Sequence, residues 1–167
     1  LESCRAVEKT SRHAREMRTI VNKRSDITPV DLESAIRSAV RNVGAEFPDG
    51  ELEVDIGDVR TVTAHRELQT AFAHLIRNGF EHNDSDAPRV EVSVQQNDES
   101  IRVRVSDNGP GIDPCELDVI DEHAESSLEH GSGAGLWIVD RVVRYSEAAL
   151  TFDTGAGTTA TITFSDR

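Results

Sequence analysis

Three pieces of the sequence have residue types and a spacing that suit nucleotide binding. Asn78 lies inside a helical stretch, Asp107-Asn-Gly-Pro-Gly111 follows an apolar strand pattern, and Gly131-Ser-Gly-Ala-Gly135 opens a helical pattern. Each piece alone is weak evidence, because short glycine patterns arise by chance and an Asn on a helix usually has no special role. Their order along the chain favours a nucleotide pocket.

The segment that begins at Asp107 has the chemistry to hold a purine base. A carboxylate accepts a hydrogen bond from an exocyclic amine such as adenine N6. Gly109 and Gly111 allow the backbone to approach a flat ring closely, and Ile112 offers an apolar wall. Taken alone, however, the segment fits an ordinary Asp-Asn-Gly turn equally well.

The glycine-rich segment 131–135 runs directly into a helical pattern. Backbone amides at a helix N-terminus, together with the helix dipole, attract phosphate groups. Gly131, Gly133 and Gly135 carry no side chains that would block such contact. A Rossmann-type turn needs a strand immediately before it, whereas the preceding stretch, 113–130, is acidic and predicts a mobile loop with a helical turn. We therefore expect phosphate binding outside a Rossmann fold.

A polar stripe on a predicted helix brings Asn78 together with two histidines. His74, Asn78 and His82 are spaced four residues apart, so they share one helical face, with Arg77 adjacent. The amide oxygen of Asn78 suits Mg²⁺, which prefers hard oxygen ligands and keeps water and phosphate in its shell. For any one of these residues a solvated helix face is the better interpretation. Their position before two glycine-rich segments favours a binding site.

Composition and charge narrow the range of partners. The chain has 167 residues and a net charge of −13, and its only lysines are Lys9 and Lys23. This charge repels nucleic acid and anionic membrane surfaces, so neither is an expected partner. The excess of acids suits a protein from a high-salt cytoplasm, and an ordinary acidic mesophilic protein fits as well. Cys4 and Cys115 match no zinc or redox spacing and are expected to be free thiols in a reducing compartment.

The first residues resemble the end of a longer helical structure. The chain begins at Leu1 without a Met, inside a charged helical pattern that reaches about residue 24 and has only a thin apolar stripe. Such a helix needs a partner, so we expect a fragment whose upstream part carries further domains or a membrane anchor. No apolar run in this sequence approaches membrane-spanning length, and no signal peptide opens it.

Hydrophobic periodicity predicts helices that alternate with antiparallel strand pairs. Helices are expected at about 2–24, 30–46, 66–81 and 135–144, with Thr28-Pro29 separating the first from the second. Strand pairs are expected at 52–56 with 59–63, at 89–95 with 100–106, and at 150–153 with 158–164. This order predicts an α/β two-layer sandwich in which helices cover one face of a mixed, largely antiparallel sheet.

The three motifs in this order resemble the N, G1 and G2 boxes of one known family. They are Asn78, Asp107-x-Gly-x-Gly111 and Gly131-x-Gly-x-Gly135-Leu. The family is the ATP-binding catalytic domain of sensor histidine kinases, within the superfamily of gyrase, chaperone, kinase and mismatch-repair ATPases. The resemblance covers about residues 30–165 and implies a Bergerat-type ATP-binding fold with a flexible lid. It also implies two domains: 28–167 as the ATPase domain, and 1–27 as the end of a dimerisation helical hairpin or linker.

The resemblance assigns roles to individual residues. Asn78 is implied to be the Mg²⁺ ligand, Asp107 the carboxylate that selects adenine, and the third motif the triphosphate side of the site. The stretch around Asn78 is also similar to the corresponding box of chemotaxis-type histidine kinases, whose polar side chains face the phosphates. The implied catalytic residues are His74 and Arg77, and the implied ATP-binding residues are Asn78, His82, Asp107, Gly109, Gly111, Ile112, Gly131, Gly133, Gly135 and Leu136.

The function implied by the resemblance is a step in two-component signal transduction. The domain would bind Mg·ATP and donate the γ-phosphate to a histidine of an upstream dimerisation domain, and a response regulator receiver domain would be an indirect partner. His13 is followed by Ala14-Arg15-Glu16, which does not resemble a phosphoacceptor pattern, so the acceptor is expected upstream. The full-length protein would be a cytoplasmic or membrane-anchored homodimer. The acidic composition and the sequence Glu-His-Gly-Ser-Gly are similar to those of haloarchaeal sensor kinases in particular.

Two other functions stay open. One is a conformational ATPase of the same superfamily, such as a chaperone or topoisomerase domain, whose catalytic Glu would occupy the position of His74. The other is a degenerate nucleotide-sensing module without transfer activity. The chain also departs from the kinase pattern at Ala134 and in the lid, where Leu117-Asp-Val-Ile120 replaces a Phe-rich box. We expect these departures to affect lid closure and the catalytic rate more than they affect nucleotide binding.

Overall fold

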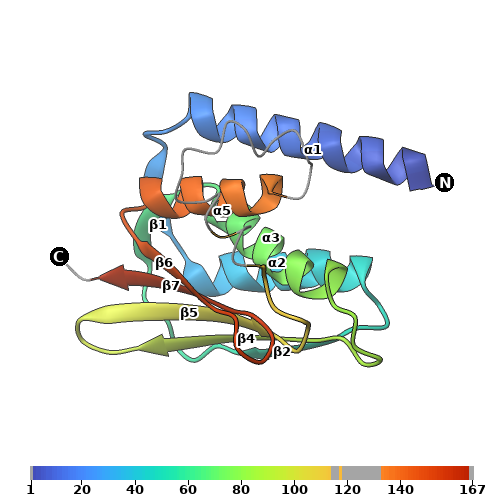
Figure 1. The fold of residues 1–167 in the computed structure, drawn as a ribbon. Helices are drawn as coiled ribbons and strands as arrows, with labels where there is room; N and C mark the ends of the chain where they lie inside the picture. Colours follow the sequence, from blue (N-terminus) through green and yellow to red (C-terminus); the bar gives the residue numbers. More distant parts are fainter. Residues whose placement is uncertain (1, 114–116, 118–132, 166–167) are drawn as a thin grey trace.

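The computed structural model describes residues 2–113, 117 and 133–165 (Figure 1). Its helices are α1 (Glu2–Asn22), α2 (Leu32–Glu46), α3 (Leu68–Glu81) and α5 (Ala134–Tyr145). Its strands are β1 (Ile27–Val30), β2 (Glu51–Asp55), β3 (Val62–His65), β4 (Arg89–Gln96), β5 (Ser100–Asp107), β6 (Ala149–Asp153) and β7 (Thr159–Ser165). The four predicted helices are confirmed, with ends that differ by no more than two residues. The loop predicted at 113–130 lies almost entirely outside the described residues.

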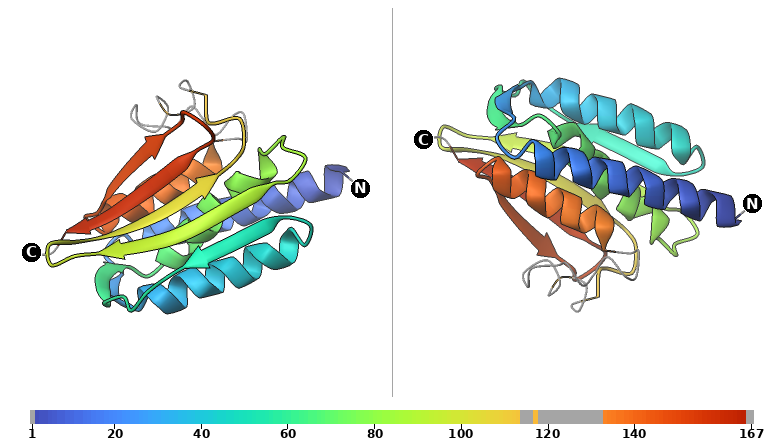
Figure 2. Two further views of the ribbon diagram at one scale, coloured as in Figure 1. Left: turned by 90° about the horizontal axis from the view of Figure 1, so that it is seen from below. Right: turned by 90° about the horizontal axis from the view of Figure 1, so that it is seen from above.

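The fold places a sheet at its base and stacks the helices on one face of that sheet (Figure 1). The five-stranded sheet has the order β2-β4-β5-β7-β6, and β2 with β4 is its one parallel pair within the described residues. Helices α2, α3 and α5 lie side by side on the sheet, and α1 crosses on their outer side (Figure 2). The predicted sandwich with a largely antiparallel sheet is therefore confirmed, and α1 forms an additional outer layer.

Side chains with the predicted periods fill the space between the sheet and the helices. Val90 and Val92 alternate on β4, and they share one hydrophobic core with Ile36 of α2, Phe72 of α3 and Ile138 of α5; all five are fully buried. Each such side chain contributes about 1.5–3 kcal/mol by leaving water. This burial holds α3 and α5 on the middle of the sheet. Asn78 lies on α3, and Asp107 lies at the end of β5.

The region around Pro29 is a strand, although the sequence predicts only a break between two helices there. β1 pairs with β3 in a separate antiparallel ladder, in which Pro29 lies opposite Thr63. A two-stranded ladder tolerates Pro because a strand at an edge has backbone groups that need no partner. The next helix begins only after Asp31, whose side chain accepts a hydrogen bond from the Ser34 amide at 2.9 Å.

The predicted hairpin of 52–56 with 59–63 is wrong. β2 pairs instead with β4, in parallel, with Leu52 beside Val90 and Val54 beside Val92. Alternation of apolar and polar residues predicts that one face of a strand is buried, but it does not identify the partner strand. Because β2 and β4 are parallel, the chain must cross over between them, and α3 is the crossover helix that lies on the sheet. The other two predicted hairpins are confirmed.

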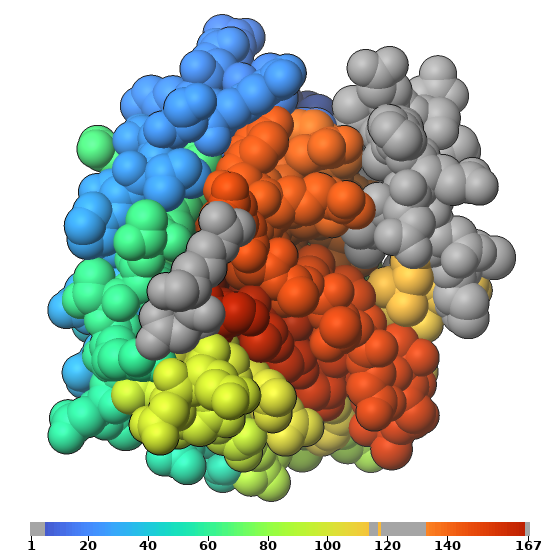
Figure 3. Space-filling model, turned by 90° about the vertical axis from the view of Figure 1, so that its left-hand side faces the viewer, coloured from blue at the N-terminus to red at the C-terminus, as the bar shows by residue number. Residues whose placement is uncertain are grey.

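The C-terminal end of α1 is tied to the body of the molecule. His65 of β3 is fully buried, and its Nε2 lies 2.9 Å from the carbonyl oxygen of Lys23. The backbone N–H of His65 donates to Oγ of Ser146, just after α5, at 2.9 Å. Figure 3 shows this end, where the segment after α1 (blue) lies against the end of α5 (orange). Within the described residues, no helix combines the length and apolar character needed to cross a membrane.

Candidate functional site

A cavity of about 290 Å³ lies between α3, the start of α5 and the strands β5, β6 and β7. Its volume is just below the usual range for small-molecule sites, which is roughly 300–1,000 Å³. Six predicted site residues line it: Asn78, His82, Asp107, Gly111, Ile112 and Leu136. The other lining residues are Leu75, Gly79, Val105, Pro110, Asp113, Phe152, Thr158 and Ala160.

A larger hollow of about 490 Å³ lies at the opposite end of the sheet, beside β1 and the end of α5. It is lined by residues such as Ile27, Val62, Tyr145 and Phe164, and it includes none of the motif residues. Volume alone therefore does not identify the site. The smaller cavity has a convergent set of polar groups, which is the stronger criterion for a ligand site.

Asp107 ends β5 and is half-buried in the wall of the smaller cavity. Its Oδ1 accepts hydrogen bonds from the backbone amides of Gly109 at 2.8 Å and Thr158 at 3.3 Å. Burial raises the pKa of Asp107, while these two amides and the nearby His82 act in the opposite direction. Among the described residues no hydrogen bond reaches Oδ2. The carboxylate is thus held through one oxygen and can accept a hydrogen bond from a ligand through the other.

Two glycines that the sequence did not identify as site residues make room for Asp107. Gly157 has a φ of 87°, and a Cβ added to it would overlap the backbone oxygen of Asp107. A Cβ added to Gly79 would lie 2.7 Å from Cγ2 of Val90 and 3.2 Å from Cβ of Asp107. A glycine inside a helix costs about 1 kcal/mol relative to Ala, so Gly79 was a signal of close packing that the sequence offered.

The turn after β5 packs against the turn between β6 and β7. Gly111 has a φ of 88°, and a Cβ added there would lie 3.2 Å from the carbonyl oxygen of Thr154. Gly109 uses its amide to hold Asp107 and does not itself line the cavity. Ile112, the next residue of this turn, is one of the apolar lining residues. The glycines of this segment therefore allow its backbone to form the wall beside Asp107.

Asn78 faces the first turn of α5. A Cβ added to Gly135 would lie 3.7 Å from Oδ1 of Asn78 and 3.2 Å from Nδ1 of His74. Gly133 is the N-cap residue of this helix and has no side chain with which to cap it, so among the described residues no side-chain cap holds the first backbone amides of α5. Leu136 of the same turn lines the cavity. Gly131, the remaining predicted phosphate-side glycine, lies outside the described residues.

The two residues predicted to be catalytic are paired with carboxylates and do not line the cavity. Arg77 is buried and donates to both carboxylate oxygens of Glu46, at 2.9 and 2.7 Å. Their hydrogen bonding raises the pKa of Arg77 and lowers that of Glu46. Nε2 of His74 lies 2.8 Å from Oε2 of Glu16, which comes from α1. His82 at the end of α3 does line the cavity.

Comparison with known proteins shows the family of this chain. Residues 63–167 match the family model HATPase_c, described as histidine kinase-, DNA gyrase B-, and HSP90-like ATPase. This match covers more than half of the 167 residues, so the chain belongs to this family of ATPases. The structure of the mycobacterial sensor histidine kinase MprB is similar with a TM-score of 0.70 and 28% identity, covering 84% of this chain and 98% of that one.

Curated relatives narrow the class further. The phytochrome-like protein Cph1 from Synechocystis is 24% identical over 146 residues, which are 84% of this chain and 20% of that protein. A probable C4-dicarboxylate sensor kinase from Bacillus subtilis is 27% identical over 104 residues, which are 59% of this chain and 19% of that protein. The chain thus spans about a fifth of these relatives. Within the ATPase family it is the ATP-binding catalytic domain of a sensor histidine kinase.

Proposed function

We propose that this domain binds Mg·ATP in the cavity at Asp107 and donates the γ-phosphate to a histidine on an upstream dimerisation domain. The observation that carries the proposal is the half-buried carboxylate of Asp107, held through Oδ1 by two backbone amides. A charge-assisted hydrogen bond from adenine N6 to Oδ2 fits this arrangement. Ile112, Leu136 and Phe152 supply apolar contacts for the faces of the base.

The phosphate end of the nucleotide is proposed to lie between Asn78 and the start of α5. The amides of this helix end favour anions, and Gly135 allows the helix to approach Asn78 closely. Gly131 and Gly133 are proposed to extend this contact along the triphosphate. Mg²⁺ bound at the Asn78 oxygen would offset phosphate charge. Phosphoryl transfer depends mainly on positioning and charge neutralisation, so the domain needs no covalent nucleophile.

His74 and Arg77 are better supported as positioning residues than as direct phosphate contacts. Each is buried against a carboxylate, of Glu16 and Glu46 respectively, and contact with phosphate would require breaking that pair. The pairing of His74 with Glu16 weakens the alternative of a conformational ATPase, in which the residue at position 74, one helical turn before Asn78, would activate water. His82, which lines the cavity beside Asp107, is the basic side chain proposed to contact the nucleotide.

The upstream partner is proposed to be a dimerisation and phosphoacceptor domain that continues from α1. The domain boundary after residue 27 stays a proposal, which is supported by the end of α1 at Asn22, before β1 begins at Ile27. The full-length protein is proposed to be a homodimer that signals to a response regulator receiver domain. The high-salt adaptation inferred from composition remains a proposal, and binding is best measured at both low and molar KCl.

Calorimetry of ATP with and without Mg²⁺ tests the site. Asp107→Asn should weaken binding by about 1–3 kcal/mol, because it removes a charge-assisted hydrogen bond. Asp98→Asn, an exposed change in the β4–β5 turn, is the matched control and should bind like the parent chain. Asn78→Ala should lose affinity mainly when Mg²⁺ is present. An ATP affinity of Asp107→Asn equal to that of the parent chain would contradict the role of Asp107. A loss of affinity in Asn78→Ala that is the same with and without Mg²⁺ would contradict the role of Asn78 as a metal ligand.

Transfer is tested separately, with the full-length protein and ATP labelled in the γ-phosphate. Label that appears on an upstream histidine and disappears in Asp107→Asn supports kinase function. Steady hydrolysis by this chain that His74→Ala abolishes would instead support the conformational ATPase. Binding of ATP without labelling of any acceptor-bearing hairpin would support the nucleotide-sensing module.

A further inference from the structure

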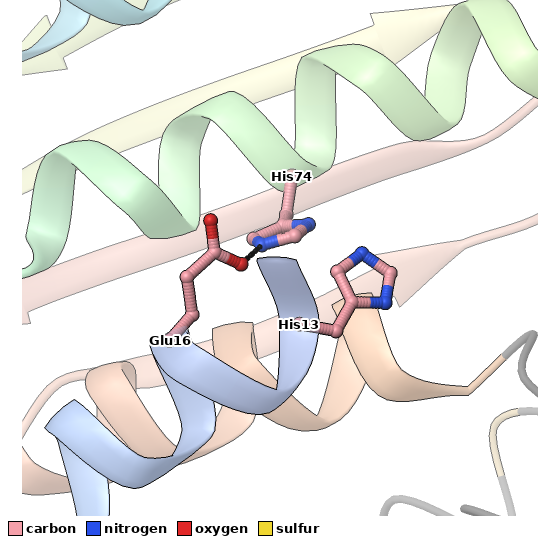
Figure 4. A group of neighbouring side chains, drawn as sticks. All are labelled: His13, Glu16 and His74. Atoms are coloured by element: carbon pink, nitrogen blue, oxygen red, sulfur yellow. Dashed lines mark hydrogen bonds and ion pairs between the residues drawn. The ribbon is translucent and has the colours of Figure 1, made fainter. Parts of the chain in front are cut away.

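Three metal-ligating side chains converge between α1 and α3, outside the nucleotide cavity (Figure 4). His13 and Glu16 are three residues apart on α1 and share one face of it, and His74 meets them from α3. Their ligand atoms all lie within 4.8 Å of one another. Nε2 of His74 is 2.8 Å from Oε2 of Glu16, and the rings of His13 and His74 are 5.2 Å apart.

The cluster contains a buried nitrogen that has no hydrogen-bond partner among the described residues. His13 is 7% exposed and His74 is 2% exposed, whereas Glu16 keeps about a quarter of its side chain in contact with solvent. Within the described part of the chain, Nε2 of His13 has no hydrogen bond. A buried, unpaired nitrogen normally carries a desolvation cost, and its position beside two other metal-ligating atoms suits coordination of a cation.

The ligand types select a class of ion. Two imidazole nitrogens and one carboxylate oxygen, with a fourth position open to water, form a set that Zn²⁺ accepts. Mg²⁺ and Ca²⁺ prefer oxygen ligands throughout, so they fit this set poorly. In a tetrahedral zinc site neighbouring ligand atoms are about 3.4 Å apart. The observed separations, from 2.8 Å to at most 4.8 Å, bracket that value and need only small side-chain rotations to match it.

The charges around the cluster are mixed. Lys9 and Arg12, on the same helix, oppose a bound cation. Lys9 is already paired with Glu81 at 2.6 Å, which reduces its effect. Glu16 lies inside the cluster and offers a negative charge. This balance favours an ion that binds imidazole strongly over one that is held by charge alone.

We propose that His13, Glu16 and His74 bind one divalent transition-metal ion of the zinc type, which fastens α1 to the ATP-binding domain. The site does not depend on the proposed phosphoryl transfer. Its position matters for that function nonetheless, since α1 leads toward the upstream domains and His74 lies one helical turn before Asn78. Occupation of the site would hold α1 against α3.

Zinc binding to the metal-stripped chain, prepared without a polyhistidine tag, tests the site. Calorimetry should give one tight zinc per chain, and zinc should raise the melting temperature. Glu16→Gln and His13→Gln should each weaken zinc binding at least about tenfold and abolish the rise in melting temperature. Glu8→Gln, an exposed carboxylate change on the same helix, is the matched control and should behave like the parent chain.

Two further results separate this site from other sources of metal binding. Co²⁺ should give the visible bands of a low-symmetry site with nitrogen and oxygen ligands and no thiolate charge-transfer band. A thiolate band would assign the metal to Cys4 or Cys115 and overturn the proposal. Zinc affinity that is unchanged in both His13→Gln and Glu16→Gln, or the absence of binding to the parent chain at equimolar zinc, would also overturn it.

Discussion

Replacing Gly157 by Ala should damage the proposed nucleotide site at Asp107, whereas the same change at Gly155 in the same turn should not. A Cβ on Gly157 would overlap the Asp107 carbonyl oxygen and lie 3.1 Å from its carbon and 3.3 Å from Cα of Asn108. These are backbone atoms that cannot rotate away. The turn between β6 and β7 must therefore withdraw from the end of β5.

The cost follows from the contacts that this withdrawal breaks. Ala in the left-handed conformation at a φ of 87° costs about 1–2 kcal/mol. The Asp107 amide donates to the carbonyl of Thr158 at 2.9 Å, and the Thr158 amide donates to Oδ1 of Asp107 at 3.3 Å. Losing both bonds adds about 1 kcal/mol each. We expect the free energy of unfolding to fall by about 3–4 kcal/mol, and ATP affinity to fall by about 1–3 kcal/mol because the carboxylate is no longer held.

Gly155→Ala is a close control because it changes the same turn in the same way. The nearest atom to a Cβ on Gly155 is Oδ1 of Asp153 at 3.5 Å, an ordinary contact. The expected result is unchanged stability or a gain of about 0.4–1 kcal/mol. Urea unfolding gives the stability of both variants, and calorimetry gives ATP affinity for each under conditions where it is folded. If Gly157→Ala matches Gly155→Ala in both measurements, the packing argument for this turn is refuted.

Two further predictions concern charged groups. Glu46→Gln should lower the free energy of unfolding by about 1 kcal/mol, because the buried Arg77 loses its ionic partner while the partial exposure of Glu46 limits the loss. Urea titration checks this against Glu33→Gln, whose exposed pair with Arg37 should matter by less than about 0.5 kcal/mol. Glu46 contributes to the free energy of unfolding above the pKa of an unfolded Glu, and this contribution is lost as the pH falls through the lowered pKa of Glu46 in the folded protein. The Glu46→Gln variant should therefore lack this decrease of stability at acidic pH. ATP affinity should also fall as the pH drops through the raised pKa of Asp107, because a protonated carboxyl is a weaker acceptor of a hydrogen bond from an amine. Calorimetry that finds the same pH dependence of ATP affinity in Asp107→Asn would contradict this prediction.

The sequence predicted several residues that line one cavity in the structure, and it did so where a residue type has few uses within a short segment. Asn78, Asp107 and Gly111 could be identified because amide, carboxylate and glycine each have a limited set of uses beside helix and strand ends. Thr158 and Gly157 were not identified because their roles exist only when β7 lies beside β5. An isolated Thr or a turn glycine has no distinguishing pattern, so pairing between distant strands had to be seen in the structure.

The same distinction explains the errors in the fold. Helical periodicity placed α2, α3 and α5 well, because a buried stripe is a local property of one segment. The partner of β2 was misassigned because its alternation fits either a neighbouring return strand or β4. The ion pairs of Arg77 with Glu46 and of His74 with Glu16 could not be predicted either, since each joins residues of two helices that are far apart in the sequence.

Helix α3 contacts the N-terminal helix and also lines the cavity at Asp107, so it connects the two structurally. It presents His74 to Glu16 of α1 and, one turn later, Asn78 to the cavity, and Gly135 of α5 packs closely against both. If α1 moves away, His74 loses its hydrogen bond to Glu16 and its ring contact with His13, and α5, which α1 also contacts, loses the packing of that helix. A resulting shift of α3 or α5 changes the distance between Asn78 and the amides at the start of α5. Docking of α1 and binding of Mg·ATP are therefore expected to be coupled, and the coupling must act equally in both directions.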